Sequence, residues 1–110
     1  LRSARRGTGR FFIVRHVGRT TGTVYETPLI LAVVPEGFVC ELTYGEDVSW
    51  YRNVMAAGRC TIVYGAVETE IVAIEPMTPE AGLAAFGFPE SLVLRILRRR
   101  EFRLLRAGRP

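Results

Sequence analysis

The chain has 110 residues, of which 48% are hydrophobic and 24% charged, with a formal net charge of +4. This length fits one domain with its own core, and this balance excludes both a disordered chain and a membrane protein. The longest apolar run, 29–34, is far shorter than the roughly 20 residues that span a bilayer. The first residue is Leu1 rather than Met, so the sequence leaves open an N-terminal stretch that is missing or cut away.

All 15 basic residues are arginines, and their placement along the chain is uneven. Residues 1–19 hold six arginines and no acid, residues 91–110 hold seven arginines and one acid, and residues 20–90 hold two arginines and ten acids. If the two ends meet in the fold, they form a basic patch suited to a polyanion, either nucleic acid or a phosphorylated, carboxylate-rich cofactor. The alternatives are codon bias towards arginine and a solvated surface without a ligand.

The first half of the chain predicts three strands and a short helix. Its β-branched and aromatic runs, separated by Gly- and Pro-containing turns, predict strands at 11–16, 23–34 and 38–43. Pro28 donates no ladder hydrogen bond, so it marks an edge, a bulge or an opening in the second strand. Ser49 is a candidate N-cap for a helix at 50–57, which Gly58 ends.

The second half predicts further strands at 59–64, 67–75 and 100–106. Thr78 followed by Pro79 starts a helix that Gly87 closes. A last helix begins near Pro89, and its apolar stripe consists of Leu92, Val93, Ile96 and Leu97. Six strands and three short helices with short turns predict an α+β, mainly β fold, a six-stranded antiparallel barrel with peripheral helices that spans 1–110 as one domain.

Side chains that carry acid–base or metal chemistry are scarce. His16 is the only histidine, and a lone histidine beside a turn usually has a structural role. Cys40 and Cys60 lie 20 residues apart, match no zinc spacing, and are expected to be free core thiols in a reducing cytoplasm. No metal site is predicted, and any redox chemistry would belong to a cofactor.

The turn between the first two strands offers an anion site. Backbone N–H groups around Gly18 and Gly22 can approach a phosphate closely, and the hydroxyls of Thr20 and Thr21 can add hydrogen bonds. Arg19 supplies a planar, bidentate donor. A plain hairpin turn is the alternative interpretation.

The order of motifs adds a family resemblance. His-x-Gly-Arg-Thr-Thr-Gly at 16–22 is followed by Glu-Thr-Pro-Leu at 26–29, Thr-Tyr-Gly at 43–45 and Trp-Tyr-Arg-Asn at 50–53. This series resembles the deazaflavin-dependent nitroreductase family, which uses coenzyme F420 and shares the split β-barrel of flavin-mononucleotide-binding oxidoreductases. The resemblance covers about residues 11–58 and continues more loosely to the end of the chain.

The resemblance implies a role for each matching residue. The family's loop grips the cofactor phosphate, which here would involve Arg19, Thr20, Thr21 and Gly22. The residues that would lie along the tricyclic ring or shape its site are Thr27, Pro28, Leu29, Thr43, Tyr44, Gly45, Trp50 and Asn53. Tyr44 is also a candidate proton donor to a reduced product, with a buried tyrosine at the barrel rim as the alternative.

The resemblance implies an oxidoreductase that passes hydride from reduced coenzyme F420 to a quinone, a nitro compound or another electron-poor organic acceptor. The alternatives are a non-catalytic binder or carrier of a deazaflavin or of FMN, and a small basic nucleic-acid-binding barrel. The nucleic-acid alternative is disfavoured because aromatic and arginine side chains do not interleave on one strand face. We expect a cytoplasmic protein without a transmembrane segment, and a homodimer is an open alternative to a monomer.

Overall fold

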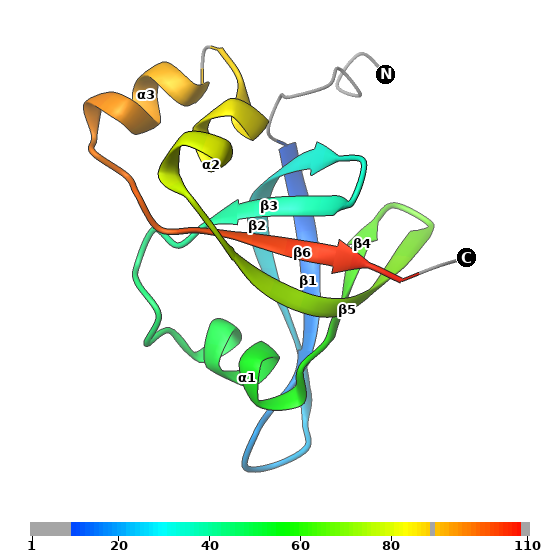
Figure 1. Cartoon of the computed structure of the whole chain (residues 1–110). Helices are drawn as coiled ribbons and strands as arrows, with labels where there is room; N and C mark the ends of the chain where they lie inside the picture. The colour runs from blue at the N-terminus through cyan, green and yellow to red at the C-terminus, as the bar shows by residue number, and fades with distance from the viewer. Residues whose placement is uncertain (1–9, 89, 109–110) are drawn as a thin grey trace.

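Six antiparallel strands close into a barrel in the computed structural model, which describes residues 10–88 and 90–108 (Figure 1). The strands are β1 (Arg10–Val17), β2 (Val24–Val34), β3 (Gly37–Glu41), β4 (Cys60–Tyr64), β5 (Val67–Met77) and β6 (Phe102–Ala107). Their order around the barrel is β1-β2-β3-β6-β5-β4, so the last strand inserts between β3 and β5. The predicted mainly β, α+β fold is confirmed.

Three short helices lie outside the barrel: α1 (Ser49–Ala57), α2 (Pro79–Phe86) and α3 (Glu90–Ile96). Helix α1 lies near the β1–β2 turn, whereas α2 and α3 lie towards the other end of the barrel (Figure 1). As predicted, Thr78 caps α2 by accepting a hydrogen bond from the Ala81 N–H at 3.1 Å. The predicted Ser49 cap of α1 is wrong, because the N-cap is Val48 and no side chain caps this helix.

Side chains that alternate along the strands fill the barrel interior. On β1 the inward positions are Phe12, Val14 and His16, all of them buried. The two cysteines are free and buried, as predicted, and burial raises the pKa of both thiols to about 12. Both thiols are therefore protonated at neutral pH, and neither is a nucleophile there.

Helix α2 covers the outer face of β2, β3 and β6. Leu83 and Phe86 of α2 form a second apolar cluster with buried side chains of these strands, among them Phe102. Gly82 permits the close approach, because a Cβ atom at this position would lie 2.1 Å from the Phe102 ring. Burial of large side chains such as Phe102 is the main source of stability in a barrel of this size.

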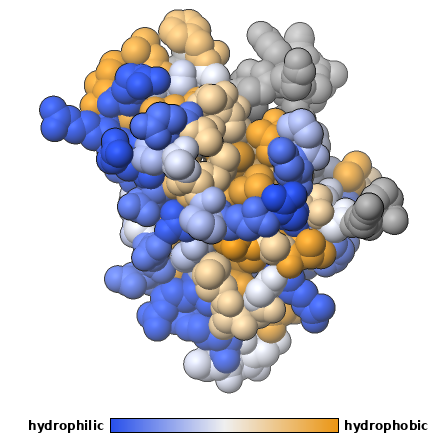
Figure 2. All heavy atoms as spheres, viewed as in Figure 1, coloured by the Kyte–Doolittle hydropathy of each residue, from blue (hydrophilic) through white to orange (hydrophobic). Residues whose placement is uncertain are grey.

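The predicted apolar stripe of α3 does not pack on the barrel. Leu94 joins the cluster under α2, but Leu92, Val93, Ile96 and Leu97 are 46%, 53%, 69% and 60% exposed. Figure 2 shows this helix as an apolar region at the upper left with hydrophilic side chains beside it. Periodicity identifies an apolar stripe without identifying what covers it, and in this chain it faces solvent.

The described residues do not bring the two arginine-rich ends together. Strands β1 and β6 are separated by two other strands on either side of the barrel. Arg15, Arg99, Arg103 and Arg106 form ion pairs with glutamates from the acidic middle of the chain. The arginines within residues 1–9 lie outside the described residues, as does Pro89, the predicted start of the last helix.

Candidate functional site

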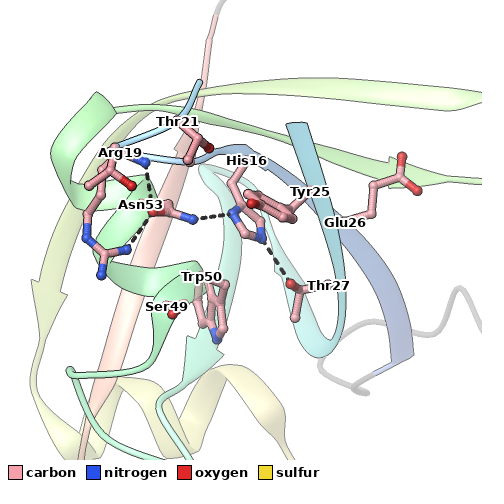
Figure 3. A pocket seen from close by; sticks show the side chains of 11 residues that line it. His16, Arg19, Thr21, Tyr25, Glu26, Thr27, Ser49, Trp50 and Asn53 are labelled. Atoms are coloured by element: carbon pink, nitrogen blue, oxygen red, sulfur yellow. Dashed lines mark hydrogen bonds between the residues drawn. The ribbon is translucent and has the colours of Figure 1, made fainter. Parts of the chain in front are cut away.

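A cavity of about 590 Å³ lies where the β1–β2 turn meets α1, and we call it the turn cavity (Figure 3). Its walls come from β1, the turn, the start of β2 and the first turns of α1. The lining residues are His16, Gly18, Arg19, Thr20, Thr21, Tyr25, Glu26, Thr27, Ser49, Trp50 and Asn53.

A row of hydrogen bonds fixes the polar side chains of the turn cavity (Figure 3). The backbone N–H and the guanidinium of Arg19 donate to Asn53 Oδ1 at 3.1 and 2.6 Å. Asn53 Nδ2 lies 3.1 Å from His16 Nδ1, and His16 Nε2 lies 2.9 Å from Thr27 Oγ1. Because the Asn53 oxygen already accepts from Arg19, its amide group donates to His16.

This row assigns His16 as a neutral imidazole. Nδ1 accepts from Asn53, so the ring proton resides on Nε2 and is donated to Thr27. Burial lowers the pKa of His16, because desolvation disfavours the charged ring. Both His16 and Asn53 are only 4% exposed, so the row links the turn to the helix from within the fold. His16 thus has the structural role that the sequence favoured.

Each of the two glycines in the turn is required for a different steric reason. A Cβ atom at Gly18 would lie 2.8 Å from Thr21 Oγ1, inside the space that the folded turn uses. Gly22 has a φ of 75°, which residues with a side chain rarely adopt. The turn closes through Gly18 N–H donating to the Thr23 carbonyl at 2.7 Å and Gly22 N–H donating to the Gly18 carbonyl at 2.9 Å. The turn therefore holds Arg19 over α1.

The turn cavity is electrostatically suited to an anion. Arg19 forms no ion pair with any carboxylate in the part of the chain that the structure describes. Ser49 and Trp50 open α1 into the cavity, and the first turn of this helix has no side-chain cap. Free N–H groups at a helix N-terminus attract negative charge. The one acid in the lining, Glu26, points away from the row and pairs with Arg15 at 3.2 Å (Figure 3).

A second hollow of about 540 Å³ follows on the same strand, and we call it the apolar groove. The β2–β3 ladder begins only at Leu31, so residues 24–30 of β2 pair with β1 alone. Pro28 therefore interrupts no pairing with β3, and its interpretation as an edge residue is confirmed. The lining residues are Phe11, Pro28, Leu29, Ile30, Cys40, Glu41, Thr43, Tyr44, Phe86, Val93 and Leu94.

The structure divides the predicted site residues between the two hollows. The turn cavity receives Arg19, Thr20, Thr21, Thr27, Trp50 and Asn53. The apolar groove receives Pro28, Leu29, Thr43 and Tyr44. Gly22 and Gly45 line neither hollow and have positive φ angles of 75° and 85° that shape their turns.

Sequence reasoning missed some residues and misplaced one. His16, Tyr25 and Ser49 line the turn cavity but were not predicted as site residues. His16 was detectable, because it continues the inward alternation of β1 as a polar residue directly before the turn. Tyr44 is 85% exposed, so its interpretation as a buried rim tyrosine is wrong.

The described residues show neither a metal-binding cluster nor a membrane-spanning helix. They contain no group of three or more His, Cys, Asp or Glu side chains placed to hold a metal ion. None of their helices is long and apolar enough to cross a membrane.

Comparison with known proteins supports the fold and nothing finer. No family model matches the chain, and no curated protein matches it. One solved structure superposes with a TM-score of 0.65 at 16% identity, over 93% of this chain and 75% of the other. The crystal structure of Atu2129 from Agrobacterium tumefaciens, a protein of unknown function, superposes with a TM-score of 0.60 at 17% identity over 97% of this chain. This chain spans about half, 53%, of that protein.

Proposed function

We propose that the chain binds the deazaflavin coenzyme F420 and passes hydride from its reduced form to a quinone, a nitro compound or another electron-poor organic acceptor. The observation that carries the proposal is the position of the two hollows along one strand. Thr27 lines the turn cavity, and the next residue, Pro28, lines the apolar groove. A ligand with a phosphate at one end and a flat apolar ring at the other would fit such a pair of hollows.

The residues of the turn cavity fit the phosphate end. The Arg19 guanidinium is held by one hydrogen bond to Asn53, which leaves its other N–H donors for a ligand. The hydroxyls of Thr20 and Thr21 and the uncapped first turn of α1 add neutral donors. Charge-assisted hydrogen bonds from a guanidinium to a phosphate are among the stronger ones in proteins.

The residues of the apolar groove fit the ring end. Pro28, Leu29 and Ile30 present one apolar wall along the half of β2 that lacks a β3 partner. Thr43 and Tyr44 also line the groove. Apolar pockets with a few polar groups at their rim are the usual sites for flat organic cofactors.

The bound cofactor would supply the hydride, so the protein needs no general base of its own. The groove's residues would orient the ring and exclude water from one face of it. Tyr44 is the candidate proton donor to the reduced product, because it lines the groove and its side chain is 85% exposed. His16 takes no part in this chemistry, since both of its ring nitrogens are used within the row.

The alternatives are a carrier of the same cofactor and an FMN protein, which would use the same two hollows. A nucleic-acid-binding barrel has less support, because Arg15, Arg103 and Arg106 on the strands pair with glutamates. Such ion pairs reduce the positive field that a polyanion needs.

The test is a fluorescence titration with oxidised coenzyme F420 and with FMN, followed by an assay with reduced cofactor and a quinone. We expect tighter binding of coenzyme F420, because its glutamate tail adds negative charge and the chain carries a net charge of +4. Added salt should weaken the binding, since exposed charges are screened over about 8 Å at physiological ionic strength. Equal or tighter binding of FMN would contradict the cofactor, and tight binding without turnover would identify a carrier.

A further inference from the structure

The exposed side of α3 combines two features that rarely occur together on a monomer. Three apolar side chains that line neither hollow, those of Leu92, Ile96 and Leu97, are exposed, and Phe88 just before the helix is 77% exposed. Contiguous exposed apolar surface usually marks an interaction site. The helix is therefore attached to the barrel by one side and presents an apolar side to an external partner.

Arginines cluster at and just after the C-terminal end of the helix. Arg95, Arg98, Arg99 and Arg100 surround a depression of about 380 Å³, together with Pro79, Glu80 and Leu83 of α2. Arg99 pairs with Glu41 at 2.8 Å. Among the side chains that the structure describes, the other three arginines have no carboxylate within ion-pair distance. Three arginines without a carboxylate partner thus lie in the same short segment, 92–100, as three exposed apolar side chains.

One of these arginines, at the end of α3, has an unusual backbone conformation. Arg98 has a φ of 59° and is the one non-glycine residue with positive φ among those described. Its N–H donates to the Arg95 carbonyl at 3.0 Å, and the Arg99 N–H donates to the Leu94 carbonyl at 2.9 Å. This is the Schellman helix ending, whose left-handed position is normally glycine. A helix dipole accounts for cations near this end, but not for an arginine where glycine fits better.

We propose that α3 and the arginines after it form a docking surface for an anionic lipid bilayer. Apolar side chains would enter the boundary between headgroups and acyl chains, and guanidinium groups would bind the lipid phosphates beside them. Charge complementarity favours this occupant, because an anionic bilayer offers acyl chains to the apolar side chains and phosphates to the arginines. Free phosphate would leave the apolar side chains exposed, and a second copy of this chain would bring like-charged arginines together. The proposal does not depend on the cofactor or on the reaction.

The experiment is sedimentation of the chain with two kinds of vesicle, pure phosphatidylcholine and phosphatidylcholine mixed with phosphatidylglycerol. We expect binding to the mixed vesicles, weaker binding to the neutral ones, and loss of the difference at high salt. The double variant Ile96→Ser/Leu97→Ser should reduce binding at least about tenfold, since each buried methylene matters at this boundary. Both positions are exposed, so the folded structure should persist.

A second variant separates lipid binding from helix stability. Arg98→Gly removes one charge but gives the left-handed position its preferred residue, so the melting temperature should stay the same or rise. Its binding to the mixed vesicles should fall about fivefold, the usual effect of one basic residue at such a surface. The matched controls are Val67→Ser, exposed on β5, and Arg59→Gln, exposed between α1 and β4, both of which should bind like the parent.

Three results would overturn the proposal. The first is recovery of the chain in the supernatant with both kinds of vesicle at low salt. The second is sedimentation of the α3 variants with the mixed vesicles to the same extent as the parent. The third is a dimer in analytical ultracentrifugation without lipid that Ile96→Ser/Leu97→Ser dissociates, which would identify a second copy of the chain as the partner.

Discussion

The turn cavity and the apolar groove share strand β2, yet they are built in different ways. The cavity is held by hydrogen bonds between buried polar side chains, with Asn53 at the centre of the row. The groove exists because a ladder is missing, since β2 pairs with β3 only from Leu31 onwards. A site of the first kind should lose binding when one hydrogen-bond partner is removed. A gap of the second kind should lose binding when a larger side chain fills it.

The difference also separates stability from binding. His16 and Asn53, at the centre of the row, are buried and support the fold, so their loss should affect both properties. Ile30, which lines the groove, is 49% exposed, so its replacement should affect binding alone. The predictions below use this contrast.

The largest effect is expected for Asn53→Leu. The substitution leaves the Arg19 N–H and His16 Nδ1 without their partner, and a buried polar group without a hydrogen bond costs about 1–3 kcal/mol. We expect the free energy of unfolding, measured in urea, to fall by at least about 2 kcal/mol. Cofactor binding should be lost in parallel.

The matched control for this prediction is Arg52→Leu. Arg52 precedes Asn53 on α1 but is exposed, so its loss should change the free energy of unfolding by less than about 0.5 kcal/mol. Similar losses for both variants would show that α1, and not the row, sets the stability.

The second effect concerns the groove and is tested by Ile30→Trp. Ile30 lines the groove at an exposed position, whereas the neighbouring Leu29 also packs against the barrel core. A tryptophan at position 30 should fill the groove and reduce cofactor affinity at least about tenfold without loss of stability. Val24→Trp, on the same strand and exposed, lines neither hollow and should bind normally. Normal binding and turnover by Ile30→Trp would exclude the groove as the ring site.

Local signals in the sequence were sufficient for most helices and strands. Thr78-Pro79 and Gly87 mark both ends of α2, and Gly58 ends α1 with a φ of 75°. Such signals depend only on residues close together in the sequence, so they can be read without knowledge of the fold. The strand order could not be predicted in this way, because placing β6 between β3 and β5 requires pairings between distant segments.

The residues of the site could be predicted from the sequence, but their division between the two hollows could not. The resemblance named residues of both hollows, but it treated Thr27 and Pro28 as parts of one surface. The boundary between the two hollows falls between these residues, because Glu26 and Thr27 line the turn cavity whereas Pro28, Leu29 and Ile30 line the apolar groove. The exposed side of α3 was not predictable, since an apolar stripe is normally covered and only the fold shows that nothing in the barrel covers it.

A smaller effect, limited to binding, is expected for Arg19→Ala. The side chain is exposed, and the backbone N–H of residue 19 still donates to Asn53 in the variant, so the free energy of unfolding should change little. A hydrogen bond to a charged group is worth about 1.5–3 kcal/mol, so cofactor affinity should fall about tenfold to a hundredfold. Arg59→Ala, at an exposed position outside both hollows, is the control. Unchanged affinity in a folded Arg19→Ala variant would remove this residue from the site.

The smallest effect is a dependence of stability on pH that arises from His16. Burial lowers the pKa of this histidine below its ordinary value of 6.5, and its Nδ1 is occupied as an acceptor from Asn53. Above pH 6.5 the ring is neutral in both the folded and the unfolded chain, so its contribution to stability is fully present. As the pH falls below 6.5, the unfolded chain takes up a proton first, and stability is lost until the folded ring is protonated as well. Urea unfolding of the parent and of His16→Gln over this range should therefore show the parent losing more stability than the variant. Carboxylates such as Glu75, whose pKa the Arg106 hydrogen bond lowers, titrate alike in both chains and cancel in the difference. Parallel curves through the acidic range would mean that His16 is not the neutral link between Asn53 and Thr27.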